Sequence, residues 1–242
     1  GKLWDFARSV DADRIARIGP TGSVKIPNSA TTIDATGQFI IPGLWDMHVH
    51  SHRARRWRYQ YPLFRAFGVT GVRDAGSHLG SALVSMERAK NDPLAPRVIR
   101  GSPIIDGAPQ VNSFGLSAED AESARKLVRV LSKLNFSFIK VYDRLTPEAY
   151  RAVADETRRA GMKLEGHVPL TLSPDDAVDA GQSALDHLTL ILEACSPGAL
   201  KATHDAFSAA PEEADSLSAL VSQSVADAIA HWTPVISPSG MT

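Results

Sequence analysis

A regular alternation of short apolar runs and amphipathic segments begins near residue 44 and constrains the fold more than any other feature of this sequence. Strand, helix and strand recur about every 20 to 25 residues, which is the rhythm of βαβ units with right-handed crossovers and parallel strands. The runs predicted as strands are rich in β-formers and end in polar residues; they are 44–50, 69–74, 97–105, 136–142, 162–167, 183–187 and 232–237. The sequence therefore predicts an α/β fold.

The segments between these runs carry start and stop signals of helices. Each helix that we delimit follows a Ser or Thr that can act as N-cap, and two of them end at a glycine. The expected helices are 118–134 after Ser117, 146–161 ending at Gly161, and 173–181 ending at Gly181.

Residues 1–43 follow a different pattern and predict a small β subdomain. Its expected strands, separated by Gly, Pro and Asn turns, are 14–18, 24–26 and 31–40. Pro42 and Gly43 end this β segment, so we place the domain boundary there, with residues 44–242 as the second domain.

The overall charge and composition exclude several classes of partner. Lys and Arg number 26 against 27 Asp and Glu, so the chain has no basic excess for a nucleic-acid backbone. No apolar stretch reaches the roughly 20 residues of a membrane helix. Because Cys195 is the single cysteine, a bound metal would need His or carboxylate ligands. The chain opens without Met or a signal-peptide pattern, so we expect the natural N-terminus upstream, and the compartment, cytoplasmic or exported, stays open.

Four histidines end three of the predicted strands. His48 and His50 alternate on one strand and so share a face, with Asp46 one layer below, while His167 and His187 end two further strands. A single His-x-His pair is more often a chance pair, and a single strand-end histidine is more often structural. Four together, at the end of a parallel sheet where barrel active sites assemble, favour a site for Zn²⁺ or a similar divalent ion.

Lys140 is a charged residue inside the apolar strand Phe-Ser-Phe-Ile-Lys-Val-Tyr-Asp. One interpretation is a lysine whose ammonium extends to the mouth of a barrel. The other is a buried, nucleophilic lysine that takes up carbon dioxide to form an anionic carbamate, which can bridge two cations. Tyr142, two residues further on, shares its face.

The segments IIPGLWDMHVH, GVTGVRDAG, FIKVYD, GHVPL and AGQSALDHL together resemble the metal-dependent amidohydrolase superfamily. The likeness is greatest to its prolidase-like and carboxypeptidase-like branch, with imidazolonepropionase more distant. The resemblance implies a (β/α)8 barrel with a β-sandwich subdomain and two divalent ions, zinc first among the candidates. It implies His48 and His50 on the first metal, carboxylated Lys140 as the bridge, His167 and His187 on the second metal, and Tyr142 polarising the substrate carbonyl.

The same resemblance implies an aspartate at the end of an eighth strand, which this sequence does not contain. The aspartates after His187 are Asp205, Asp215 and Asp227, and none falls at a strand end. We therefore expect a chain truncated at both ends, with seven of eight barrel strands, that is poorly soluble or oligomeric and hydrolyses little by itself.

The function implied by the resemblance is metal-dependent hydrolysis of an amide bond, most simply in a dipeptide or an N-acyl amino acid. A cyclic amide, ester or lactone remains open as the substrate, and a catalytically incomplete metal-binding remnant remains open as the alternative. A sugar- or nucleotide-binding protein is disfavoured, because no Gly-rich phosphate loop follows a strand. We expect a small-molecule substrate and a homo-oligomer.

Weaker candidates are residues with a structural and a functional interpretation of similar weight. Arg73 and Asp74 could touch substrate or form an ion pair at the rim. The basic residues after His50 could bind a carboxylate, although a solvated helix start is favoured; they are Arg53, Arg55, Arg56 and Arg58. The remaining histidines, expected to be surface or capping residues, are His52, His78, His204 and His231.

Overall fold

The structure is a computed structural model that describes residues 6–11, 14–51, 56–188, 190–196 and 198–209. The chain divides into two compact units, residues 1–43 and 44–242. The predicted strand at 232–237 lies outside the described residues.

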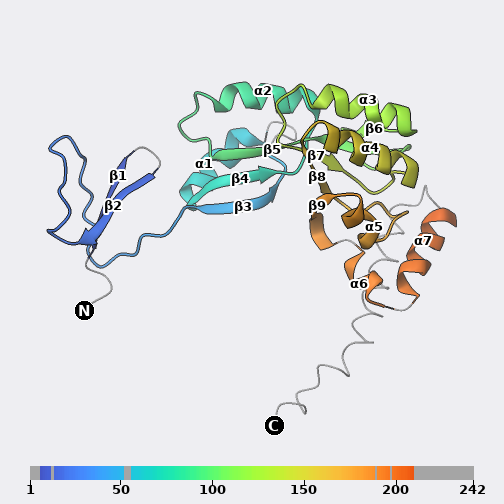
Figure 1. The fold of residues 1–242 in the computed structure, drawn as a ribbon. Coiled ribbons are helices and arrows are strands. Elements are labelled where there is room, and N and C mark those ends of the chain that lie inside the picture. The colour runs from blue at the N-terminus through green and yellow to red at the C-terminus, as the bar shows by residue number, and fades with distance from the viewer. Residues whose placement is uncertain (1–5, 12–13, 52–55, 189, 197, 210–242) are drawn as a thin grey trace, which may run out of the picture. The chain divides into compact units, whose positions relative to one another are not determined.

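A curled sheet of parallel strands forms the second unit (Figure 1). Its strands are β3 (Leu44–Val49), β4 (Val69–Asp74), β5 (Arg97–Asp106), β7 (Phe138–Val141), β8 (Lys163–Gly166) and β9 (Gln182–Leu185). They are hydrogen-bonded in chain order, as in a barrel, and the short β6 (Leu116–Ser117) pairs with β5. Six predicted strands are therefore confirmed, and they form a half-barrel.

Helices connect the strands, as the βαβ rhythm predicts. They are α1 (Trp57–Ala66), α2 (Leu79–Ala89), α3 (Ala121–Leu131), α4 (Pro147–Arg159), α5 (Pro174–Asp179), the short η2 (Asp186–Leu188), α6 (Ile191–Ala194) and α7 (Ala199–Ala209). The caps predicted for two of them are confirmed, because the Thr146 hydroxyl accepts from the amide of Ala149 and the Ser173 hydroxyl accepts from that of Asp176.

The N-cap predicted for α3 is wrong. Ser117 lies in β6, paired with β5, and the cap is Asp120, whose carboxylate accepts from the amide of Ser123 at 2.7 Å. The helix begins later than its sequence pattern indicates because the residues before Asp120 are held by the sheet.

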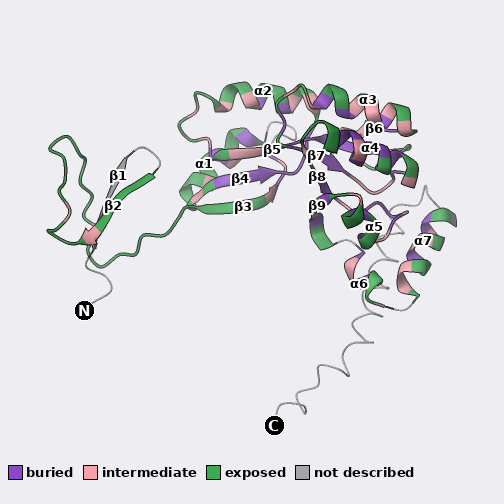
Figure 2. Ribbon diagram, in the orientation of Figure 1, coloured by how far each residue is buried: buried purple, intermediate pink, exposed green. Residues whose placement is uncertain are grey.

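The core of the unit lies between the sheet and the helices that cover it. Ile139 and Val141 of β7 pack with Val128 of α3 and with Tyr150 and Val153 of α4, all fully buried. Figure 2 shows β4, β7 and β8 mostly buried and β3 more exposed. Since side chains alternate along a strand, Lys140, between Ile139 and Val141, lies on the opposite face of the sheet.

The first unit contains one hairpin among its described residues. β1 (Phe6–Asp11) pairs antiparallel with β2 (Arg14–Pro20), which covers the strand predicted at 14–18. The strands predicted at 24–26 and 31–40 are wrong. Those residues pair with no strand, and the carboxylate of Asp34 instead accepts from the amide and hydroxyl of Thr36, which forms a turn. The predicted sandwich is not seen in the described residues.

No helix in the described part of the chain has the length and apolar character needed to span a bilayer.

Candidate active site

The four predicted histidines come together at the carboxyl ends of β3, β8 and β9. The ring centroids of His48 and His50 are 5.2 Å apart, those of His48 and His187 are 4.4 Å apart, and those of His187 and His167 are 5.1 Å apart. The rings thus form a continuous row. Histidines separated by more than a hundred residues meet because parallel strands all end at one edge of the sheet.

His187 sits on an unusual backbone. It follows β9 rather than ending it, in η2, and its φ is 60°, in the left-handed region that non-glycine residues rarely adopt. Leu188 and Leu190 also have positive φ, at 56° and 63°. Such conformations cost roughly 1–3 kcal/mol each and occur most often where function requires a particular geometry.

Neighbouring groups orient two of the imidazoles. The Nδ1 of His50 is 2.7 Å from the carbonyl oxygen of Gly76, and the Nδ1 of His167 is 2.7 Å from Oδ1 of Asp143. Both acceptors require a proton on Nδ1, which in a neutral imidazole leaves the lone pair on Nε2. A carboxylate or carbonyl behind the imidazole is the usual support of a metal-ligating histidine.

Lys140 is fully buried beside this row. Its Nζ contacts Oδ2 of Asp186, the residue before His187, in a buried ion pair. Burial lowers the pKa of Lys140, against the effect of Asp186. Burial would by itself raise the pKa of Asp186, but the neighbouring His48 and the cations of Lys140 and Arg73 hold it well below its usual value.

Arg73 is buried in the same cluster and forms ion pairs with Glu165 and Asp186. Its guanidinium binds Oε2 of Glu165 through Nε at 2.7 Å and through Nη2 at 2.6 Å, and its Nη1 is 3.2 Å from Oδ1 of Asp186. Asp74, the next residue, is buried and accepts from the amide of Gly76 and the hydroxyl of Ser77. Both residues therefore make structural contacts.

Tyr142 follows β7 and lies against the row of histidines. Its ring centroid is 4.1 Å from that of His167, with an angle of 33° between the two planes. It is partly buried, so its side chain is at the edge of the cluster.

The residue types in this cluster suit a divalent metal. Partial burial and the neighbouring His48 and His167 lower the pKa of His187, which favours the neutral imidazole that a metal requires. Within the described residues, however, no three His, Cys, Asp or Glu side chains are placed to hold one ion as they stand. The donor types therefore fit, but the described side chains do not converge on one ion in this arrangement.

Three carboxylates of this site were missed by sequence reasoning, namely Asp143, Glu165 and Asp186. Glu165 is a charged residue in a buried strand, which is the signal that singled out Lys140. Asp186 directly precedes a candidate ligand. Asp143 gives no comparable signal, because its contact to His167 depends on how two loops meet.

Other candidates are placed elsewhere. The Nδ1 of His78 accepts from the amide of Gly80 and caps α2, as expected for a capping histidine, and the Nε2 of His204 is 3.1 Å from the Leu172 carbonyl oxygen. Arg58 is exposed at the start of α1, 5.6 Å from the Trp57 ring. The remaining candidates, His52, Arg53, Arg55 and His231, lie outside the described residues, and Arg56 is the exposed residue before α1.

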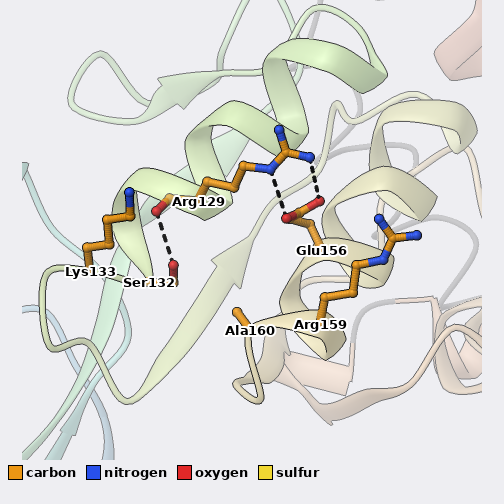
Figure 3. Close-up of a pocket in the computed structure, with 6 residues that line it drawn as sticks. All are labelled: Arg129, Ser132, Lys133, Glu156, Arg159 and Ala160. Carbon is orange, nitrogen blue, oxygen red and sulfur yellow. Dashed lines mark hydrogen bonds and ion pairs between the residues drawn. The ribbon is translucent and has the colours of Figure 1, made fainter.

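A separate hollow lies between the ends of α3 and α4 (Figure 3). There Arg129 binds Glu156 through two hydrogen bonds of 2.9 and 3.2 Å, beside Lys133 and Arg159. Basic side chains at the last turns of helices compensate the helix dipoles. The Arg129–Glu156 pair beside this hollow thus links α3 to α4.

The sequence matches no known family model and no curated protein. Solved structures do share its fold. A protein described as a prolidase, from Bifidobacterium longum, is 23% identical with a TM-score of 0.58, covering 72% of this chain and 46% of that one. An amidohydrolase is 19% identical with a TM-score of 0.61, covering 86% and 64%. A Xaa-Pro dipeptidase is 19% identical with a TM-score of 0.57, covering 74% and 56%.

With identities of 19 to 23%, the TM-scores of 0.57 to 0.61 show that the chain shares the fold of these structures. The chain spans about half the length of the first of these structures, the protein described as a prolidase, of which it covers 46%.

Proposed function

We propose that this chain is part of a metal-dependent hydrolase of the amidohydrolase superfamily, in its prolidase-like and carboxypeptidase-like branch, that cleaves an amide bond. The observation that carries the proposal is the row of four imidazoles at the ends of three parallel strands, next to a fully buried lysine. The folds of an amidohydrolase and a dipeptidase support it.

The proposed centre holds two divalent ions, zinc first among the candidates. His48 and His50 would bind one ion and His167 and His187 the other, with Lys140 between them as a carbamate. Two divalent ions would repel an unmodified Lys140 ammonium by roughly several kcal/mol, whereas they would attract its negatively charged carbamate. The tautomers that Gly76 and Asp143 impose on His50 and His167 support this assignment.

Such ions supply Lewis acidity and lower the pKa of water to about 7, so that hydroxide is present at neutral pH. The chain's own residues position the reactants. Tyr142, whose ring centroid lies 4.1 Å from that of His167, would donate its hydroxyl proton in a hydrogen bond to the scissile carbonyl oxygen. β7 and β8 are mostly buried and would keep water away from the Lys140 side chain.

The proposed substrate is a dipeptide or an N-acyl amino acid. A prolidase and a Xaa-Pro dipeptidase are among the structures with this fold, which supports a peptide with a free carboxylate. The loops that would set side-chain preference follow the strands.

The test is hydrolysis by the metal-loaded chain of a panel that contains Xaa-Pro dipeptides, N-acyl amino acids, a cyclic amide and a lactone. His48→Ala should abolish both zinc binding and cleavage, whereas His204→Ala, at a histidine bonded to Leu172 elsewhere in the unit, should preserve both. Because this chain lacks the aspartate that the resemblance implies and is expected to hydrolyse little by itself, the decisive quantity is the cleavage rate above that of His48→Ala. Zinc binding with no such excess for any amide would support a metal-binding domain and contradict the hydrolase.

A further inference from the structure

Asp106 ends β5 beside the candidate site. Ile105 pairs with Val141 of β7, so Asp106 and Tyr142 follow at the same level of the sheet edge. The Asp106 side chain is fully buried although it carries a carboxyl group. A carboxylate shielded from water needs hydrogen-bond partners from the protein, and Asp106 finds them in the loops after β5 and β7.

Three backbone amides donate to this carboxylate. Its Oδ1 accepts from the amide of Gly107 at 2.9 Å and from that of Arg144 at 2.8 Å, and its Oδ2 accepts from the amide of Val111 at 2.8 Å. Gly107 and Val111 belong to the loop after β5, whereas Arg144 belongs to the loop after β7. These three bonds use most of the acceptor capacity of a carboxylate, so Asp106 serves to hold the two loops together.

The two loops also contact each other directly. The Arg144 guanidinium donates to the carbonyl oxygen of Pro109 at 2.8 Å, and a Cβ added to Gly107 would lie 1.8 Å from the Arg144 carbonyl oxygen. The loop after β8 joins them, because the amide of Leu170 donates to the carbonyl oxygen of Asp143 at 2.8 Å. Three loops are thus packed as one unit beside the buried carboxylate.

The residues just before Arg144 belong to the candidate site. The ring of Tyr142 lies 4.1 Å from that of His167 between centroids, and Oδ1 of Asp143 is 2.7 Å from Nδ1 of the same imidazole. A backbone held at Arg144 restricts where both side chains can lie.

We propose that Asp106 is a positioning residue of the site, which fixes the place of Tyr142 by binding the amide of Arg144. The proposal rests on the proposed function, since Tyr142 meets substrate only in that account. The alternative is a carboxylate that stabilises the two loops without affecting the site. Only positioning predicts that, in a folded variant, Tyr142 moves relative to His167.

The experiment measures the nuclear Overhauser effect between the rings of Tyr142 and His167 in the full chain, labelled at tyrosine and histidine. Asp106→Ala releases both loops and should lose most of this effect. For any amide that the zinc-loaded chain cleaves, kcat should fall by up to about 100-fold with KM little changed. The matched control is Leu131→Ala, at a buried core residue of α3 outside both loops, which should lower stability and keep the effect.

Asp106→Asn separates the contribution of the two loops. A carboxamide oxygen at the position of Oδ1 keeps the bonds from Gly107 and Arg144, but the NH₂ group then faces the Val111 amide, donor against donor. Exchange of the Val111 amide with solvent should become about tenfold faster or more, while the Arg144 amide stays protected and the ring effect persists. Loss of the ring effect with the Arg144 amide still protected would overturn the proposal.

Far-UV circular dichroism reports whether each variant is folded. A folded Asp106→Ala chain with an undiminished ring effect would overturn the positioning role, as would a lack of the effect in the unsubstituted chain. If Asp106→Ala does not fold, Gly107→Ala decides, because its Cβ pushes the same loops apart at Arg144 and should also remove the effect. A folded Gly107→Ala chain that keeps the effect, or unfolding of both variants, would make the junction purely structural.

Failure of the proposed function gives a different result. In that case the unsubstituted chain cleaves no amide faster than His48→Ala does, while the ring effect, which requires neither metal nor hydrolysis, still decides whether Asp106 positions Tyr142.

Discussion

Tyr150→Phe should destabilise the half-barrel although it removes a single oxygen. Tyr150 is fully buried in α4, and its hydroxyl donates to Oε1 of Gln182 at 2.7 Å. The Gln182 amide nitrogen donates to the carbonyl oxygens of Gly166, His167 and Ala184 at 3.0, 3.2 and 3.1 Å. The network therefore connects α4 to the ends of β8 and β9, where two candidate ligands lie.

The magnitude follows from what the substitution leaves behind. Without the hydroxyl, Oε1 of Gln182 is a buried acceptor that has lost this donor, which costs about 1–3 kcal/mol of the free energy of unfolding. Gln182→Leu should cost at least as much, since it leaves the Tyr150 hydroxyl with only the longer 3.4 Å contact to the Ala177 carbonyl oxygen and removes the donor to three buried carbonyl oxygens. The double variant should lose less than the sum, by about 1 kcal/mol, because the shared bond is lost once.

Urea denaturation of the full chain, followed by far-UV circular dichroism, measures these differences. Tyr59→Phe is the matched control, because Tyr59 is 55% exposed and its change should stay within about 0.5 kcal/mol. A Tyr150→Phe chain as stable as the unsubstituted one, or strict additivity in the double variant, would refute the reasoning.

Two further predictions concern pH and backbone packing. Burial raises the pKa of Tyr61 to about 12. Since an unfolded tyrosine ionises near 10, the unfolded chain binds fewer protons above that pH, and stability should fall by about 3 kcal/mol between about pH 10 and 12; urea midpoints across this range should fall less steeply for Tyr61→Phe. Gly107→Ala should cost about 3 kcal/mol, because its Cβ would lie 1.8 Å from the Arg144 carbonyl oxygen. Gly80→Ala, whose Cβ would lie 3.4 Å from the nearest atom, should be neutral or stabilising by up to about 1 kcal/mol in the same urea assay, and equal effects of the two would contradict the packing argument.

Periodicity was sufficient to predict most of the second unit. The strands end where polar residues interrupt apolar runs, and Thr146 and Ser173 begin helices because their hydroxyls satisfy free backbone amides. These signals are local, so the sequence contains them. The same local reasoning failed at 24–26 and 31–40, where β-forming residues have no strand beside them to complete a ladder.

The histidines of the site could be placed together from the sequence because parallel strands share one edge. The residues that contact the site's side chains and orient them could not be predicted from the sequence. The contacts of Asp143 with His167 and of Asp186 with Lys140 span 24 and 46 residues and depend on the conformation of the loops after β7 and β9. Periodicity cannot predict the positive φ of His187 either, because such a conformation is uncommon for histidine and nothing in the local sequence marks it.

The most direct test of the central claim is anomalous diffraction at the zinc edge from crystals of the zinc-loaded chain. The account predicts two anomalous peaks at the carboxyl ends of β3, β8 and β9, within about 2.0–2.1 Å of an imidazole nitrogen of His48 and His50 for one ion and of His167 and His187 for the other. Density continuous from Lys140 to both peaks would be its carbamate. Zinc bound elsewhere on the chain, or no peak beside these four imidazoles, would contradict the account.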